Sequence, residues 1–107
     1  MKSIPFIGTR REVAIAAMDI VRLEEFALLA RELNFGRASD RSCVSRTAFS
    51  RHIREVEEFF GVEVVIRSRP IRLTRSGELL ARYLESAAAN FEDLKVAMQK
   101  VAHEDGT

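Results

Sequence analysis

The stretch SRTAFSRHIREVEEFFGV (residues 45–62) carries two different faces on what its pattern predicts to be one helix, capped by Ser45 and ended by Gly61. Apolar side chains recur at steps of four, three and four residues and predict a face against a core: Phe49, Ile53, Val56 and Phe60. At about 100° per residue, the opposite face holds Thr47, Ser50, Arg51 and Arg54. Since no carboxylate precedes Glu55 in this helix, the small and basic face favours a negatively charged partner.

Length and composition favour one compact domain. The chain has 107 residues, of which 47% are hydrophobic, and a domain commonly has about 100 to 200 residues. Its 17 Lys and Arg nearly balance its 16 Asp and Glu, so net charge alone indicates no partner. The charge is unevenly distributed, because residues 37–75 hold nine arginines, no lysine and five acids.

The composition gives no support to a metal site, a membrane span or an enzyme. Cys43 is the only cysteine, so an internal disulfide is impossible and a reducing cytoplasm is the simplest setting. We expect Cys43 to be a small buried side chain and His52 to be a packing residue. No apolar run approaches the roughly 20 residues of a transmembrane helix, and no set of residues suggests a reaction. We therefore expect no cofactor, no metal, no membrane association and no enzymatic activity.

Before the opening stretch, the sequence predicts a core helix and a short helix. Asp19 is a suitable N-cap for the core helix, and Asn34 and Gly36 end it. The apolar stripe of this helix is expected at Ile20, Leu23, Phe26, Ala27, Ala30 and Leu33. The short helix spans about residues 37–42, and a tight turn at about residues 43–45 leads into the long helix. Two helices joined in this way form a helix-turn-helix.

After the long helix, the period of the apolar residues changes. The segment VEVVIRSRPIRLT is rich in β-branched residues and predicts two short strands at about residues 62–67 and 71–73. Its SRP forms the turn, and Pro70 restricts the hairpin to the edge of a sheet. Thr74 is a suitable N-cap for a last helix over about residues 75–102, followed by a frayed end.

The last helix contains a heptad repeat. Apolar residues step by 4, 3, 4, 3, 4 and 3 along it: Leu80, Leu84, Ala87, Phe91, Leu94, Met98 and Val101. A helix of about 28 residues is roughly 42 Å long, which exceeds the core of a small domain, so its outer part needs a partner. We expect a homodimer through this seam, parallel or antiparallel. A monomeric helix packed on its own domain is the alternative.

The helix-turn-helix with its basic face predicts binding to double-stranded DNA. A major groove about 12 Å wide admits one helix, and Thr47 and Ser50 are small enough to let the backbone approach the bases. Arg51 and Arg54 can reach guanine O6 and N7. Ser45 and the first free amides of the helix suit a phosphate oxygen.

The hairpin and the short helix add candidate contacts to the DNA backbone. Four arginines occur within nine residues with no acid among them: Arg67, Arg69, Arg72 and Arg75. On a projecting hairpin they predict a wing that lies along the sugar-phosphate chain or in the minor groove. Arg37 and Arg41 of the short helix could contact the same backbone. The alternative is a helical dimerisation module, in which the heptad seam is the function and the arginines are only solvated or protect an edge strand.

The order of these elements resembles the N-terminal winged helix-turn-helix of the LysR-type transcriptional regulators. The resemblance begins at MDIVRLEEFALLARELNFGRAS, continues through VSRTAFSRHIREVEEFFGVEVV and closes at IRLTRSGELL. It implies a mainly α fold, in which a three-helix core and a β-hairpin wing occupy residues 18–74 and a long C-terminal dimerisation helix occupies residues 75–107. Residues 1–17 precede the pattern and are expected to be an extension, either disordered or derived from a vector or an upstream start.

The resemblance implies a DNA-binding role in a cytoplasmic bacterial activator or repressor. Such regulators dimerise through the linker helix, usually antiparallel, and read interrupted dyad sites. The family's base contacts correspond to Arg46, Thr47, Ser50 and Arg51. Its phosphate contacts correspond to Arg37 and the wing arginines. Because the family commonly has Gln-Pro where this chain has Arg46-Thr47, the preferred bases should differ from the usual ones.

The family's regulators also carry a C-terminal, periplasmic-binding-protein-like domain that senses a small molecule. Nothing follows Thr107 in this chain. The resemblance therefore implies that a small-molecule effector acts only through a sensor domain absent from this chain. We expect an excised DNA-binding fragment, and a short natural protein without the sensor is the alternative.

Overall fold

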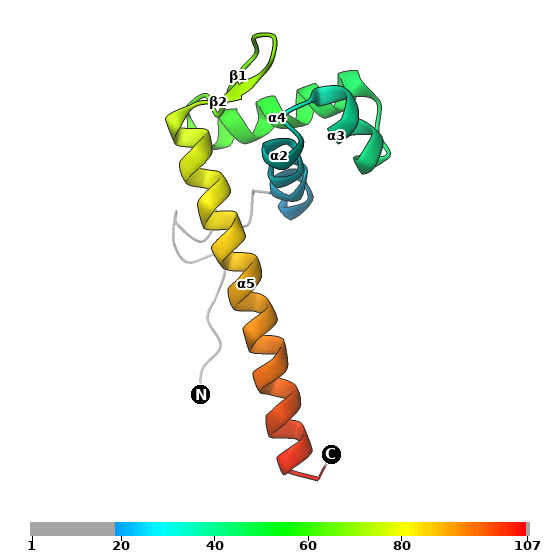
Figure 1. Cartoon of the computed structure of the whole chain (residues 1–107), viewed down its shortest axis with the longest axis vertical. Helices are drawn as coiled ribbons and strands as arrows, with labels where there is room; N and C mark the ends of the chain where they lie inside the picture. The colour runs from blue at the N-terminus through cyan, green and yellow to red at the C-terminus, as the bar shows by residue number, and fades with distance from the viewer. Residues whose placement is uncertain (1–18, 107) are drawn as a thin grey trace, which may run out of the picture.

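The computed structural model describes residues 19–106, which form a helical head, a small hairpin and one long helix that leaves the head (Figure 1). The elements are α2 (Ile20–Glu32), α3 (Phe35–Ser42), α4 (Arg46–Phe60), β1 (Val65–Ile66), β2 (Arg72–Leu73) and α5 (Arg75–Glu104). The two strands are antiparallel, with Val65 opposite Leu73. The predicted winged helix-turn-helix with a long C-terminal helix is confirmed. The expectations for residues 1–17 and for Thr107 lie outside the described residues.

A buried apolar cluster joins the head to the hairpin. It consists of Phe26, Leu29, Ala38, Phe49, Ile53, Val64 and Val65, which come from α2, α3, α4 and the start of the hairpin. The beginning of α5 covers this cluster as well, and Gly77 is buried there. A Cβ on Gly77 would overlap the carbonyl oxygen of Val64, so α5 can approach the hairpin this closely only because the residue is glycine.

The predicted helix caps are confirmed. The side chain of Asp19 accepts a hydrogen bond from the amide of Val21 at 2.9 Å, and the side chain of Thr74 accepts one from the amide of Gly77 at 2.9 Å. Gly61 ends α4 with a left-handed φ of 75°. These short local bonds explain why the sequence alone locates three of the helix ends.

The predicted boundary between α2 and α3 is wrong by a few residues. Asn34 caps α3, because its side chain accepts a hydrogen bond from the amide of Arg37 at 2.8 Å, and α3 therefore begins two residues earlier than expected. Leu33 ends α2 with a φ of 50° and is exposed, as is Ile20 at the other end. The apolar stripe predicted both residues in the core, and the structure places neither of them there. Leu29, which the stripe omitted, is fully buried.

Four further expectations need correction. Phe60 is 44% exposed because it lies in the last turn of α4, beyond the buried cluster. Cys43 is exposed rather than buried, because it ends α3 in a left-handed conformation with a φ of 60°. The strands are two residues each and α5 continues to Glu104. Just before β1, the amide of Val64 bonds to the side chain of Glu57 instead of a strand partner.

The heptad seam of α5 divides into a packed part and an exposed part. Leu80 and Leu84 are partly buried against the core of their own domain. The later seam residues are exposed: Ala87, Phe91, Leu94, Met98 and Val101. None of the helices between residues 19 and 106 is long and apolar enough to cross a membrane.

Candidate nucleic-acid interface

A tight turn fixes the start of α4 against α3. The amide of Cys43 donates to the carbonyl of Asp40 at 3.1 Å, and the amide of Val44 donates to the carbonyl of Ser39 at 3.2 Å. Ser45 then begins the next helix, as predicted, by accepting a hydrogen bond from the amide of Ala48 at 3.1 Å. Because every residue of the turn is held, the direction of α4 relative to α3 is set locally.

The two faces of α4 separate as the sequence predicted. The buried face consists of Phe49, His52, Ile53 and Val56. On the other side, Arg46, Thr47, Arg51 and Arg54 are exposed and Ser50 is half-buried. In the range 19–106, no acidic side chain pairs with Arg46, Arg51 or Arg54. Three guanidinium groups therefore remain available to a partner beside two small hydroxyl side chains.

The beginning of α4 adds donors for an anion. In a helix that starts at Arg46, the amides of Arg46 and Thr47 have no carbonyl one turn earlier to bond to. The aligned peptide dipoles place a partial positive charge at the same end. Ser45 accepts a bond from Ala48 and keeps its own hydroxyl hydrogen to donate. Together these groups suit a phosphate oxygen.

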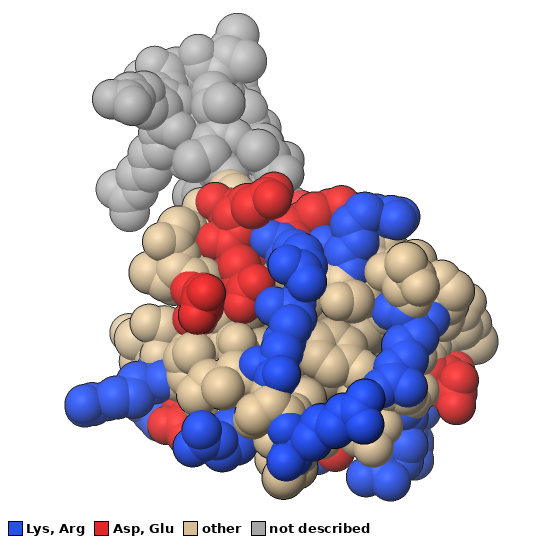
Figure 2. Space-filling view, turned by 90° about the horizontal axis from the view of Figure 1, so that it is seen from above, with Lys and Arg blue, Asp and Glu red and all other residues tan. Residues whose placement is uncertain are grey.

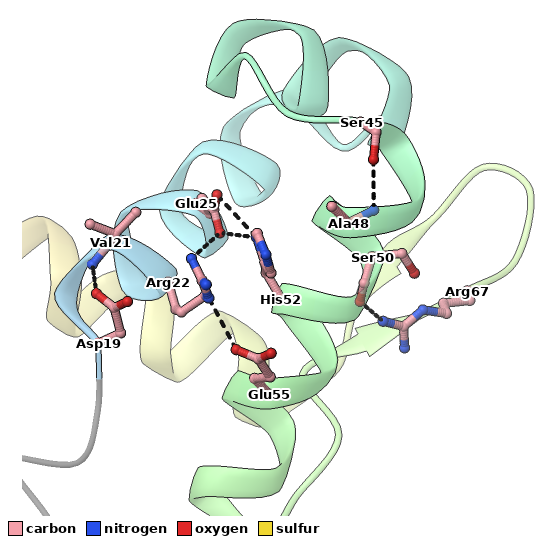
Figure 3. A network of polar contacts seen from close by, with 10 residues as sticks. All are labelled: Asp19, Val21, Arg22, Glu25, Ser45, Ala48, Ser50, His52, Glu55 and Arg67. Carbon is pink, nitrogen blue, oxygen red and sulfur yellow. Dashed lines mark hydrogen bonds and ion pairs between the residues drawn. The ribbon is translucent and has the colours of Figure 1, made fainter.

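A polar network behind the exposed face attaches α4 to α2 (Figure 3). Nδ1 of His52 donates to Oε1 of Glu25 at 3.0 Å, and both side chains are buried. Arg22 lies 3.6 Å from Glu25 and donates to Glu55 at 3.0 Å. His52 is thus buried as expected, but it is also hydrogen-bonded. The sequence did not indicate Glu25 as its partner, because the two residues are 27 positions apart.

The two arginines of α3 share one carboxylate. Nε of Arg37 lies 3.3 Å from Oε1 of Glu32, and Nε of Arg41 lies 2.9 Å from Oε2. Both arginine side chains are 65% exposed while Glu32 is 19% exposed. Glu32 therefore orients the two guanidinium groups and leaves much of each accessible.

The arginines of the hairpin are not equivalent. Arg69 and Arg72 are exposed, and so is Arg75 at the start of α5. The Arg67 side chain is only 28% exposed and is paired with Glu57 at 3.3 Å. Sequence reasoning missed Glu57, although its position next to Val56, at the edge of the core face of α4, was a signal. Figure 2 shows the end of the molecule that carries the hairpin, where Lys and Arg spread over the face and most Asp and Glu gather at one side.

The same part of the chain contains no metal-binding constellation. Among residues 19–106, no three His, Cys, Asp or Glu side chains are grouped so that they could hold a metal ion.

Comparison with known families identifies this arrangement. The profile described as the bacterial regulatory helix-turn-helix protein, lysR family, matches residues 20–78. The chain belongs to the LysR family. The match covers α2, α3, α4, the hairpin and the first turn of α5, which are the elements that form the face described above.

Relatives of this LysR-family chain are regulators. It is 34% identical over 85 residues to the probable cat1 operon transcriptional activator of Acinetobacter lwoffii, which covers 78% of this chain and 28% of that protein. It is 36% identical over 87 residues to the HTH-type transcriptional regulator HdfR of Escherichia coli, and the aligned region covers 80% of this chain and 30% of HdfR. The chain spans about three tenths of the length of these curated relatives.

Solved structures of LysR-family proteins have the same fold. The DNA-binding domain of BenM in complex with benA site 1 DNA superposes with a TM-score of 0.71 at 26% identity, covering 78% of this chain and 99% of that one. DarR of Vibrio fischeri in complex with DNA has a TM-score of 0.68 at 33% identity, covering 80% and 30%.

Proposed function

We propose that this chain binds double-stranded DNA sequence-specifically, as the DNA-binding part of a LysR-type bacterial transcriptional regulator. In this proposal α4 enters the major groove, and the wing of residues 62–73 lies on the backbone or in the minor groove. The observation that supports it most is the row of exposed, unpaired arginines beside small side chains on one face of α4. BenM and DarR, to which the chain is similar, are described in complexes with DNA.

We divide the proposed DNA-contacting side chains into those that would read base edges and those that would contact the DNA backbone. Base edges would be read by Arg46, Thr47, Ser50, Arg51 and Arg54. The DNA backbone would be contacted by Arg37, Arg41, Ser45, Arg69 and Arg72. Arg67 was expected in the second group, but its pairing with Glu57 gives it a separate role, argued in the next subsection.

A homodimer through α5 completes the proposal. The exposed apolar residues Phe91, Leu94 and Met98 need cover that their own domain does not provide. Two copies related by a twofold axis would present two α4 helices to two half-sites, so the preferred site would be an interrupted dyad. The regulator would work in the cytoplasm, and any small-molecule effector would act through a sensor domain of a longer protein.

The alternative is a helical dimerisation module, which the exposed apolar residues Phe91, Leu94 and Met98 of α5 also favour. A double change of Arg51 and Arg69 to alanine separates the two functions. We expect loss of specific DNA binding in fluorescence anisotropy with an unchanged dimer in sedimentation velocity. A double change of Arg31 and Arg82 to alanine removes the same charge away from the α4 face and is the control. Specific DNA binding by the first double variant that equals that of the control would contradict a role for Arg51 and Arg69, and equally weak binding of the unchanged chain to every duplex would favour the dimerisation module.

A further inference from the structure

Arg67 turns back toward α4, the proposed recognition helix, instead of projecting from the wing. Its Nη1 lies 3.3 Å from Oε1 of Glu57, and its Nη2 donates to the carbonyl oxygen of Ser50 at 3.5 Å, the bond drawn in Figure 3. Its guanidinium carbon lies 5.5 Å from the centre of the Phe35 ring, within the range of a cation–π contact. One side chain of the wing thus contacts both α4 and α3.

Glu57 holds the other end of this connection. Its second oxygen, Oε2, accepts hydrogen bonds from the amides of Val64 at 2.9 Å and Val65 at 3.3 Å, and these two residues begin the hairpin. Both oxygens of one carboxylate on α4 are therefore committed to the wing. The Glu57 side chain is 12% exposed, so solvent and salt screen this pair less than a pair of fully exposed charges.

The geometry also links the pair to a base-reading position. Glu57 and Ser50 are seven residues apart, which is about two turns of α4. Arg67 contacts both, so it joins the wing to α4 at two points. The helix must fit the groove and the wing must fit the backbone of the same duplex. Binding is tighter when the relative position of the two elements is fixed beforehand.

We propose that Arg67 and Glu57 form a strut that sets the position of the wing relative to the recognition helix, with Arg67 a positioning residue and not a phosphate contact. The inference rests on the proposed function, because a fixed wing matters only if helix and wing bind one duplex. The competing role, a swing of Arg67 onto a DNA phosphate, makes opposite predictions for Glu57. A phosphate contact would be strengthened or unaffected by removing the nearby negative charge, whereas a strut would be broken.

The test uses the full 107-residue chain and a duplex selected by the unchanged protein, so failure of the proposed function appears first, as the absence of any selected duplex. Arg67→Gln, Glu57→Gln and the double variant are then titrated at several salt concentrations, with circular dichroism as the check on folding. We expect each single change to weaken binding by about tenfold and the double change to be little worse than the single ones, because contacting residues are coupled. The slope of log K against log salt should stay the same.

Arg69→Gln is the matched control from the exposed tip of the wing. It should lower the magnitude of the salt slope by about one, as expected for a lost phosphate contact. If Arg67→Gln lowers the slope in the same way and Glu57→Gln leaves affinity equal or higher, the strut is wrong and Arg67 is a phosphate contact.

Arg67→Lys keeps the test decisive if Glu57→Gln disturbs folding. Lysine retains the charge but lacks the planar fork that reaches Glu57 and Ser50 together over the Phe35 ring. The strut predicts that Arg67→Lys binds about as weakly as Arg67→Gln while keeping the full salt slope. Affinity restored to that of the unchanged protein would overturn the strut.

Discussion

Arg51 lies in the second turn of α4, exposed and without an acidic partner among residues 19–106. If it reads a base edge, Arg51→Ala should cost roughly 1 to 3 kcal/mol of binding free energy on the preferred duplex and relax the preference at one base pair. Titrations against duplexes with single substitutions measure both effects. Arg69→Ala should instead weaken all duplexes alike. Equal effects of the two changes on every duplex would contradict the division between reader and backbone contact.

At this scale, the sequence predicted which side chains share a face but not which of them are paired. Periodicity places Ser50 and Arg51 opposite Phe49 and Ile53, and the structure agrees. Whether an arginine is free depends on carboxylates that folding brings near it. Arg67 is paired with Glu57, ten residues away, while Arg51 has no acidic partner in the described range, and spacing along the chain does not distinguish the two arginines.

Gly77 is the element-scale feature that joins α5 to the hairpin. A Cβ there would overlap the carbonyl oxygen of Val64, so Gly77→Ala should force α5 away and lower the free energy of unfolding by about 1 to 3 kcal/mol. In thermal unfolding, each lost kcal/mol should lower Tm by roughly 4–8 °C. Ser76→Ala, at the exposed neighbouring position, should change stability by no more than about 0.5 kcal/mol. A more stable Gly77→Ala variant, as expected for an ordinary helix interior, would show that the close approach is not needed.

The helix ends show how far element prediction reaches. Asp19, Ser45 and Thr74 cap helices through bonds to amides two or three residues away, and all three were predicted. The boundary at Leu33 and Asn34 was missed because the sequence predicts Asn34 as a residue that ends α2, whereas its side chain caps α3 by accepting a hydrogen bond from the amide of Arg37. The first strand is shorter than expected because the amides of Val64, just before β1, and of Val65, its first residue, donate to the side chain of Glu57.

For the whole molecule, α5 is the element whose outer half has no cover from its own domain. The sequence grouped seven seam residues, but Leu84 is partly buried against the core, so changing it would destabilise the head as well as affect a dimer. Phe91→Glu with Met98→Glu alters only exposed positions, 71% and 62% accessible. We expect monomers in sedimentation velocity and much weaker binding to a full dyad, with a folded head.

Ala89→Glu with Val96→Glu is the matched control for that change. These two positions are also seven residues apart and exposed, but they lie on the opposite side of α5. The control should remain dimeric. A dimer that survives the seam change and is lost in the control would move the interface to the other face of the helix.

Sequence-specific reading of DNA by the α4 face is tested most directly by selecting duplexes from a random pool on the purified chain. The selected duplex and a scrambled control are then titrated at two salt concentrations. We predict an interrupted dyad bound at least about 10³-fold more tightly than the control, the low end of usual specificity ratios, with a steep salt dependence from the phosphate contacts. Equally weak binding of both duplexes would contradict specific reading, leave the arginines as a nonspecific basic face, and make dimerisation through α5 the leading function.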